Sequence, residues 1–213
     1  MKLIIASHNA GKVKEIKRLL QDFDLEVSSL FDYPDIGDIE ETGTTFEANA
    51  RLKAEPMADH FQAIVLADDS GLVVDALDGQ PGVYSARYAG EGHDDQANNQ
   101  KLLTQLEGVQ GTDRSAHFVS CLVLAYPGMD SLVVEGQAHG LIQETLAGVD
   151  GFGYDPLFYV PEEGRTFAEM PLERKNEISH RAHAFAKLVE VLPDWLDQVK
   201  ALEGNKQQDK DRD

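Results

Sequence analysis

The chain has 213 residues, of which 42% are hydrophobic, enough for one substantial core or for two lobes that share one. Its formal net charge of −19 argues against a general DNA- or RNA-binding protein, because such a surface repels phosphates. No apolar run approaches the roughly 20 residues that a membrane helix needs, and the N-terminal run is too short for a signal peptide. We therefore expect a cytoplasmic protein that binds neither nucleic acid nor membrane.

The first part of the chain alternates strands and helices. Residues 3–6 predict a strand, an amphipathic helix follows Gly11, and residues 25–30 predict a second strand. A second helix is predicted to begin at Thr44, which has capping-box spacing with Glu47. Pro56 is expected to kink or end that helix because proline lacks the amide hydrogen that a helix uses.

The middle of the chain is richer in strands. Residues 63–67 and 72–76 predict two strands, and residues 116–126 and 131–137 predict two more, joined by a turn at Pro127-Gly128. Between these pairs, Asp94 or Asp95 is expected to cap a helix that ends near Gly108. The only cysteine, Cys121, falls in one of these apolar strands, so we expect a core residue and no internal disulfide.

The last part of the chain predicts a glycine-rich loop, a short aromatic strand and a final amphipathic helix. That helix spans about 179–192, and Pro193 is expected to interrupt it. We take residues 1–200 as a single two-lobed domain and residues 201–213 as a polar, disordered tail. The order of elements predicts an α/β fold with α+β character and a mixed sheet.

The segment SHNAGK, residues 7–12, lies between the first predicted strand and helix. Backbone amides and the helix dipole favour an anion there, and Lys12 adds a positive charge. The segment lacks the spacing of a Walker A motif, since Val13 stands where that motif needs serine or threonine. A plain strand–helix turn capped by Asn9 remains the alternative.

Two adjacent carboxylates, Asp68 and Asp69, end the predicted strand over residues 63–67. Two unpaired buried carboxylates would cost several kcal/mol, and a magnesium ion would remove that cost, since it prefers carboxylate oxygens and also binds substrate phosphates. Glu40 and Glu41 form a second acidic pair in the loop before the Thr44 helix. The alternative is that one aspartate only caps a turn completed by Ser70 and Gly71.

Two further segments carry candidate binding groups. In GFGYDP, residues 151–156, two aromatic rings flanked by glycines suit stacking on a base, unless the segment is a tight turn with core aromatics. In KNEISHR, residues 175–181, basic side chains gather in an otherwise acidic chain, unless they are merely solvated. His180 and His183 lack a third zinc ligand nearby. Together, the phosphate-type loop, acid cluster, aromatic turn and basic segment are what a magnesium–nucleotide site requires.

In that order and spacing, the chain closely resembles the inosine triphosphate pyrophosphatase family. The matching segments span residues 7–184 and are SHNAGKVKEI, EETGTTFEANARLKA, ADDSGLVVDALDGQPGVYSARYAG, GFGYDPLFYVPEEGRTFAEM and KNEISHRAHA. The resemblance implies a two-lobed fold with a long central mixed sheet flanked by helices, an active-site cleft between the lobes, a magnesium cofactor and a homodimer. It also implies hydrolysis of non-standard purine nucleoside triphosphates such as ITP, dITP and XTP.

The resemblance also implies roles for individual residues. Asp69 matches the residue that activates water, and it matches a metal position together with Glu40; Lys53 resembles a catalytic lysine on the phosphate side. The residues implied to bind the nucleotide are Ser7, His8, Asn9, Ala10, Gly11, Lys12, Ser70, Phe152, Gly153, Tyr154, Asp155, Lys175, His180 and Arg181. His8 departs from the family, which more often has glycine at this position.

These roles predict a mechanism in which water attacks the α-phosphorus and magnesium pyrophosphate leaves. Asp69 would deprotonate the water, while Lys12, Lys53 and Lys175 would neutralise the leaving group. Donors from His180 and Arg181, or backbone amides, would favour a six-keto purine over adenine. Two alternatives remain, a nucleotide sensor without turnover and a pyrophosphatase for other altered nucleotides.

Overall fold

The structure is a computed structural model that describes residues 1–37 and 39–210, with side chains described for residues 1–37 and 39–204. One mixed sheet of seven strands runs through it in the order β2-β1-β3-β4-β5-β6-β7. The strands β1 and β2 pair in parallel, as do β1 and β3, and all later neighbours are antiparallel. The strands are β1 (Lys2–Ile5), β2 (Glu26–Ser29), β3 (Ile64–Val74), β4 (Ser115–Ala125), β5 (Leu132–Ile142), β6 (Phe158–Val160) and β7 (Arg165–Thr166).

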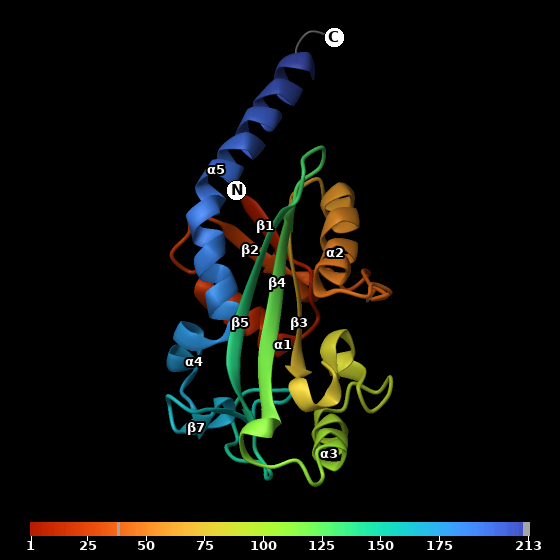
Figure 1. The fold of residues 1–213 in the computed structure, drawn as a ribbon. Coiled ribbons are helices and arrows are strands. Elements are labelled where there is room, and N and C mark those ends of the chain that lie inside the picture. The colour runs from red at the N-terminus through yellow and green to blue at the C-terminus, as the bar shows by residue number, and fades with distance from the viewer. Residues whose placement is uncertain (38, 211–213) are drawn as a thin grey trace.

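Helices cover both faces of this sheet, and α2 and α5 lie on opposite sides of its long strands (Figure 1). The α-helices are α1 (Ala10–Leu19), α2 (Phe46–Phe61), α3 (Asp95–Gln105), α4 (Leu172–Ile178) and α5 (His180–Lys210), and a 3₁₀ helix spans Gly82–Arg87. The predicted α/β fold with a long, mixed, helix-flanked sheet is therefore confirmed. That residues 1–200 form a single two-lobed domain stays a prediction.

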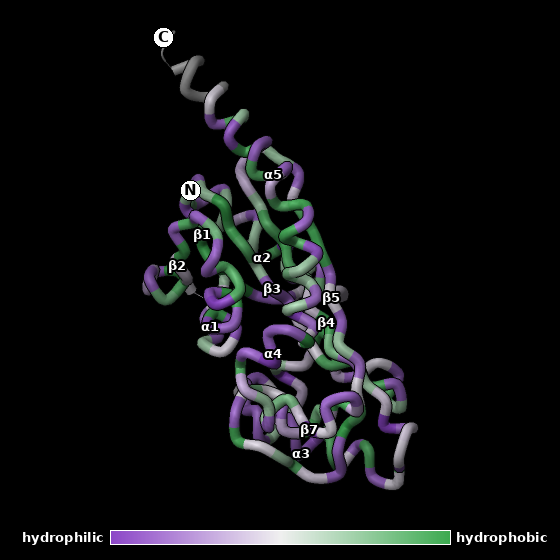
Figure 2. The backbone as a smooth tube through the Cα atoms, turned by 90° about the vertical axis from the view of Figure 1, so that its left-hand side faces the viewer, coloured by the Kyte–Doolittle hydropathy of each residue, from purple (hydrophilic) through white to green (hydrophobic). Residues whose placement is uncertain are grey.

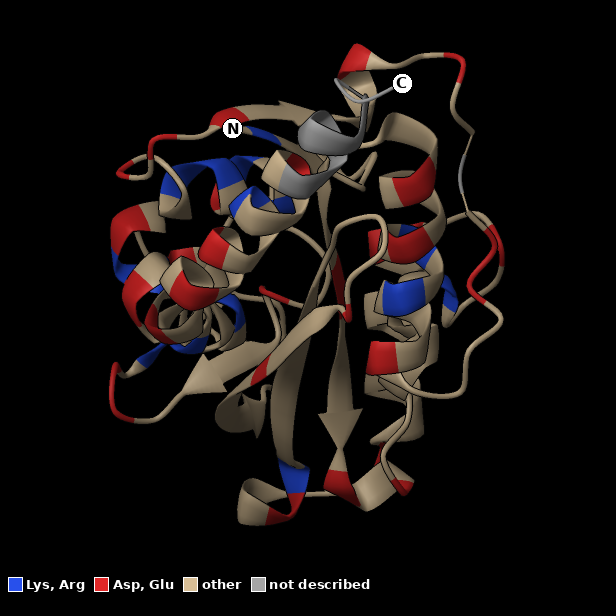
Figure 3. Cartoon of the chain, turned by 90° about the horizontal axis from the view of Figure 1, so that it is seen from above, with Lys and Arg blue, Asp and Glu red and all other residues tan. Residues whose placement is uncertain are grey.

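Three buried clusters stabilise the two faces of the sheet. One packs α1 and α5 against Leu66 and Leu122, and a second packs α2 against Ala67 and Cys121 on the opposite face. The third lies beyond them, around Phe158 and the ends of β3 to β5. Figure 2 shows the corresponding pattern, with hydrophobic runs in the central strands and alternating character along α5. The acidic residues lie around the molecule rather than in one patch (Figure 3).

The prediction of two strands around the aspartate pair was wrong, because β3 continues from Ile64 to Val74. Asp68 and Asp69 lie in its middle and pair in register with Leu122 and Cys121 of β4. The acids do not end the strand because cations from both faces compensate their charges. The parallel neighbour β1 does end there, at Ile5 opposite Leu66, so the acids lie just beyond its carboxyl end.

Several helix boundaries also differ from the predictions. The cap of α2 is Thr45 rather than Thr44, since Thr45 Oγ1 accepts the Ala48 amide at 3.1 Å. Neither Pro56 nor Pro193 ends its helix. Both prolines are exposed, so water can reach the carbonyls that they leave without an amide partner.

The C-terminal part contains elements that the sequence did not predict. Helix α4 begins at Leu172 and contains Lys175, and β7 follows β6. Residues 201–210, expected as a disordered tail, continue α5, and residues 211–213 lie outside the described residues. Among the described residues, we find no helix with the length and apolar character that a membrane crossing requires.

Candidate active site

The two adjacent aspartates of β3 point to opposite faces of the sheet, as alternating strand side chains must. Asp69 faces α2, where its Oδ1 lies 2.9 Å from Lys53 Nζ and its Oδ2 accepts from Asn49 at 3.3 Å. Asp68 faces α1 and α5, where its Oδ2 lies 3.2 Å from Lys12 Nζ and 3.0 Å from Arg181 Nη2. Asp68 and Asp69 thus belong to two separate clusters of charged side chains, one on each face of the sheet.

The two lysines meet at the peptide between these aspartates. Lys53 Nζ donates to the Asp68 carbonyl at 3.1 Å from one face, and Lys12 Nζ donates to the same oxygen at 3.4 Å from the other. Lys53 also contacts the Asp69 carboxylate, whereas Lys12 contacts the Asp68 carboxylate on the other face. A negatively charged substrate at this place would meet two cations and one buried carboxylate.

The Asp69 cluster contains two carboxylates that share one lysine. Lys53 Nζ also lies 2.8 Å from Glu41 Oε1, and Arg87 Nη1 lies 3.1 Å from Glu41 Oε2. Burial, together with the charge of Glu41, raises the pKa of Asp69 despite Lys53 and Lys12. Burial also opposes ionisation of Glu41, but Lys53, Lys12 and Arg87 outweigh it and lower the pKa of Glu41.

Glu40, predicted as a metal ligand, is exposed and makes no ion pair among the described residues, whereas its neighbour Glu41 joins the cluster. No group of three or more histidine, cysteine or acidic side chains in the described part of the chain is arranged to hold a metal ion. Magnesium needs fewer, since it usually keeps several waters and binds one or two carboxylates plus substrate phosphates. The carboxylates of Asp69 and Glu41, which share Lys53, fit this need for one or two carboxylate ligands.

The Asp68 cluster is a chain of buried ion pairs that crosses the site. Arg181 connects Asp68 to Glu15 of α1, and Glu15 Oε1 lies 2.8 Å from Lys175 Nζ. Lys175 in turn lies 2.7 Å from Asp155 Oδ2. The cations outweigh the effect of burial and lower the pKa of both Asp68 and Glu15. These pairs bring together the predicted phosphate loop, acid pair, aromatic turn and basic segment.

Glu15 belongs to this site although the sequence did not single it out. It is 3% exposed, on a helix whose other buried residues are Val13 and Ile16. The available signal was its spacing of three residues from Lys12, which places both side chains on one side of α1. A glutamate at such a position needs buried cations, and Lys175 and Arg181 provide them.

Of the two aromatic rings in the turn over residues 151–155, only that of Phe152 is accessible to a base; the ring of Tyr154 is not. Tyr154 is buried in the core, and its hydroxyl donates to the Ser85 carbonyl at 2.8 Å. Phe152 is partly exposed, and Lys175 Nζ lies 4.9 Å from its ring centre. Asp155 Oδ2 accepts the Phe152 amide at 2.9 Å, and burial raises the pKa of Asp155 despite Lys175.

The loop over residues 7–12 lies against this turn. A Cβ added at Gly11 would lie 2.5 Å from Phe152 Cδ1, so the absence of a side chain at Gly11 permits the contact. Asn9 caps α1 by accepting the Lys12 amide at 3.0 Å, and the Asn9 amide donates to Ser7 Oγ at 3.1 Å. Of the other predicted nucleotide-binding residues in this loop, His8 packs edge-on against the Phe31 ring, and Ala10 is the first residue of α1.

His180 and Arg181 are both buried at the start of α5. The His180 ring stacks on Phe118 with centres 4.7 Å apart, and its Nδ1 has no hydrogen-bond partner among the described residues. Burial and the adjacent Arg181 charge lower the pKa of His180 well below 6.5, which keeps the ring neutral. Arg181 donates to Glu15, Asp68 and, at 3.2 Å, to Ser70 Oγ.

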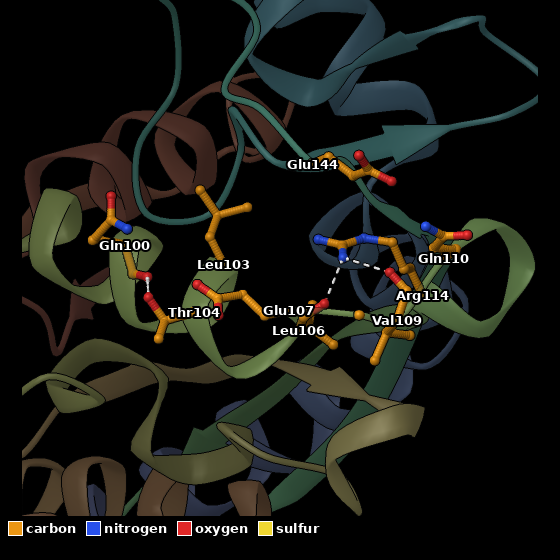
Figure 4. Close-up of a pocket in the computed structure, with 10 residues that line it drawn as sticks. Gln100, Leu103, Thr104, Leu106, Glu107, Val109, Gln110, Arg114 and Glu144 are labelled. Carbon is orange, nitrogen blue, oxygen red and sulfur yellow. Dashed lines mark hydrogen bonds between the residues drawn. The ribbon is translucent and has the colours of Figure 1, made fainter.

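The pocket drawn in Figure 4 is a separate feature near the end of α3. Its volume is about 340 Å³, and its ten lining residues include none of the predicted site residues. The guanidinium of Arg114 in its wall donates to the carbonyls of residues 106, 109, 142 and 143. Since these bonds engage the guanidinium in holding backbone, the pocket is not a second candidate for phosphate binding.

Comparison with known proteins places this geometry in context. A sequence profile of the Ham1 family matches residues 3–191. A dITP/XTP pyrophosphatase of Listeria monocytogenes serotype 4b (strain F2365) is 54% identical over 198 residues, which cover 93% of this chain and 98% of that protein. A dITP/XTP pyrophosphatase of Bacillus anthracis is 50% identical over 196 residues, covering 91% and 97%.

Solved structures agree with these sequence matches. The Ham1 protein of Staphylococcus aureus superposes with a TM-score of 0.79 and 43% identity, covering 93% of this chain and 99% of that one. A nucleoside-triphosphatase / dITP/XTP pyrophosphatase of Mycobacterium abscessus has a TM-score of 0.72 and 44% identity, covering 88% and 98%.

Proposed function

The chain belongs to the Ham1 family, and we propose that it hydrolyses non-standard purine nucleoside triphosphates, among them dITP, XTP and ITP, to the monophosphate and pyrophosphate. It is a hydrolase, and its relatives are dITP/XTP pyrophosphatases. The observation that carries this function is the meeting of Lys12 and Lys53 at the Asp68 carbonyl, beside the buried Asp69 carboxylate. Two cations and one poised base suit attack of water on a phosphate.

The reaction assigns Asp69 the role of general base. Water attacks the α-phosphorus, its proton passes to Asp69, and the bond between the α-phosphorus and the bridging oxygen breaks as pyrophosphate leaves. The raised pKa of Asp69 suits a general base, because a base accepts a proton most effectively when its pKa lies closer to the pH at which the enzyme works. In this proposal Lys12 and Lys53 neutralise the phosphates, and their meeting at the Asp68 carbonyl is what supports these roles.

Lys175 is better assigned to the base end of the nucleotide than to the leaving group. Its charge is already compensated by Glu15 and Asp155, and its ammonium lies over the Phe152 ring. We propose that Phe152 stacks on the base, since the ring is the partly exposed one. Neutral His180, with an unpartnered ring nitrogen, offers a contact to the base edge.

We further propose that the metal is magnesium and that Asp69 and Glu41, rather than Glu40, hold it together with the substrate phosphates. When bound, magnesium supplies positive charge to the phosphates and orders nearby water. Lys53 forms an ion pair with each of the two carboxylates, so their negative charges already have a cationic partner before metal binds. The remaining predicted nucleotide contacts in residues 7–12, Ser70, Gly153, Tyr154 and Arg181 are proposed in supporting roles around this centre.

The homodimer, the cytoplasmic location and the absence of nucleic-acid binding remain predictions. The resemblance motivates the dimer, and the net charge of −19 motivates the expectation about nucleic acid. Sedimentation velocity tests the first expectation, with a single species of twice the 23.5 kDa chain mass as the predicted result.

The function is tested by measuring pyrophosphate release from ITP, XTP, GTP and ATP, with magnesium and with a chelator. We expect fast, magnesium-dependent release from ITP and XTP and little from GTP or ATP. Tight ITP binding without release from any of the four would support a sensor instead. Release from altered pyrimidine nucleotides, with none from ITP, would support the second enzymatic alternative.

A further inference from the structure

The beginning of α3 holds the backbone of the turn that carries Phe152 and Asp155. Asp95 Oδ2 accepts the amide of Gly153 at 2.7 Å, and Asn99 Nδ2 donates to the carbonyl of Gly153 at 2.8 Å. Both polar backbone groups of Gly153 are thus bound by side chains from one helix. Gly153 has a φ of +61°, a left-handed conformation that suits glycine and that these bonds help to fix.

The amide of Asn99 has a fixed orientation in this contact. Its Nδ2 also donates to the carbonyl of Asp95 at 2.8 Å, and both acceptors are backbone carbonyls, which require a donor. Asn99 is 5% exposed, so water does not readily replace these bonds. An aspartate here would place a carboxylate oxygen against two carbonyl oxygens.

Helix α3 is itself anchored to a neighbouring segment. Asn98 accepts the Ala89 amide at 2.7 Å and donates to the Ala86 carbonyl at 3.1 Å. The same segment accepts the Tyr154 hydroxyl at the Ser85 carbonyl. Helix α3, residues 85–89 and the turn over residues 151–155 are therefore joined by hydrogen bonds, so a shift of α3 would also shift the turn.

We propose that Asp95 and Asn99 are positioning residues for base recognition, acting through Gly153. Gly153 lies between Phe152 and the Tyr154-Asp155 pair, so a change in its peptide planes moves the ring of Phe152 and the carboxylate of Asp155. Phe152 packs on Gly11 of the phosphate loop, and Asp155 binds Lys175. Asp95 and Asn99 thereby set where the base lies relative to the phosphates. This inference rests on the proposed function, because it concerns the same nucleotide site.

The test compares Asp95→Ala with the matched variant Asp94→Ala. Asp94 caps the same helix by accepting the amides of Gln96 and Ala97, and among the described residues it makes no hydrogen bond to Gly153. Asp95→Ala should raise the KM for ITP about 3- to 10-fold, as expected for loss of one charge-assisted hydrogen bond at an exposed position, with kcat within about twofold. Asp94→Ala should lower thermal stability and leave that KM unchanged.

Two further variants sharpen the comparison. Asp95→Asn keeps an oxygen that can accept the Gly153 amide, so it should restore most of the wild-type KM. Asn99→Ala removes the buried donor and should raise the KM at least as much as Asp95→Ala. An equal KM change in Asp94→Ala and Asp95→Ala, or an unchanged KM in Asp95→Ala, would overturn the proposal.

Amide hydrogen exchange supplies a readout that does not need turnover. Exchange of the Gly153 amide should be faster in Asp95→Ala than in both the wild type and Asp94→Ala. Unchanged exchange there would contradict the proposal. Failure of the wild-type protein to hydrolyse ITP would instead contradict the proposed function, so the two failures are distinguishable.

Discussion

The two faces of β3 differ in the charged partners that they give to two adjacent carboxylates. On one face, Asp68 is enclosed by Arg181, Lys12 and the Ser120 hydroxyl, which donates at 2.6 Å, and its pKa is lowered. On the other, Asp69 has one lysine and an asparagine, shares that lysine with Glu41, and has a raised pKa. The pleat of one strand thus separates a structural charge from a reactive one. Removing each carboxylate should therefore have a different consequence.

The largest expected effect is on turnover in Asp69→Asn. Loss of a general base should lower kcat for ITP about 10²- to 10⁴-fold. Stability should be unchanged or slightly higher, because ionised Asp69 is disfavoured by folding when its pKa is raised. Pyrophosphate release and urea unfolding measure the two quantities, and a kcat within a few-fold of the wild type would remove Asp69 from the mechanism.

Asp68→Asn should instead act on stability. Arg181 is 1% exposed and would keep only Glu15 as a charged partner, so breaking this buried pair should cost about 3 kcal/mol. The free energy of unfolding in urea measures the loss. If Asp68→Asn were as stable as Asp69→Asn, the assignment of the two faces would be wrong.

Glu15→Gln tests the link between the Asp68 face and the base turn. The substitution removes a buried charge that pairs with both Lys175 and Arg181, and we expect a loss of about 2 kcal/mol together with a higher KM for ITP. Glu47→Gln is the matched control, because its partner Arg51 is on the surface and such pairs contribute less than about 1 kcal/mol. Equal effects of the two substitutions would show that the buried chain of ion pairs is unimportant.

The smallest of these effects should separate two neighbouring glutamates. Glu41→Gln should raise the magnesium concentration for half-maximal ITP hydrolysis about tenfold or more, because even substitutions of residues that only support metal ligands cost about that much affinity. Glu40→Gln should leave it unchanged, because Glu40 is exposed. The reverse result would return the metal role to Glu40.

The sequence predicted the elements whose hydrophobic pattern is strong and missed those that depend on distant partners. The apolar runs around Ile4 and Val123 predict β1 and β4, and Asp94, one of the two expected caps, does cap α3. The run from Ile64 to Val74 predicts two strands instead of one, because two aspartates and a glycine are typical of a strand end. The cations that keep this strand continuous come from α1, α2 and α5, which no local pattern connects to it.

The candidate site shows the same limit. The four segments that the sequence singled out do converge, because buried ion pairs connect them through Asp68, Glu15 and Lys175. Which of Glu40 and Glu41 turns inward depends on the path of a loop, and adjacent glutamates look equivalent in sequence. The helix α4 was missed because LERKNEI is polar, although Lys175 within it is buried by its ion pairs.

The pH dependence of the two carboxylates tests the central comparison most directly. Asp68, with a lowered pKa, contributes stability that is present above its unfolded pKa of about 3.8 and is lost as pH falls through its folded pKa. Asp69, with a raised pKa, opposes folding when ionised, and this cost disappears as pH falls below its unfolded pKa. Activity should therefore fall as pH decreases through the raised pKa of Asp69, because the base becomes protonated.

The first measurement would be an NMR titration of the side-chain carboxyl carbons of Asp68 and Asp69, assigned with the two asparagine variants. We predict that Asp69 titrates above its ordinary value of 3.8 and that Asp68 titrates below it. We also predict that the acidic limb of kcat/KM for ITP follows Asp69. Titration of Asp68 above Asp69, or an acidic limb that follows Asp68, would contradict the division of roles between the two faces of β3.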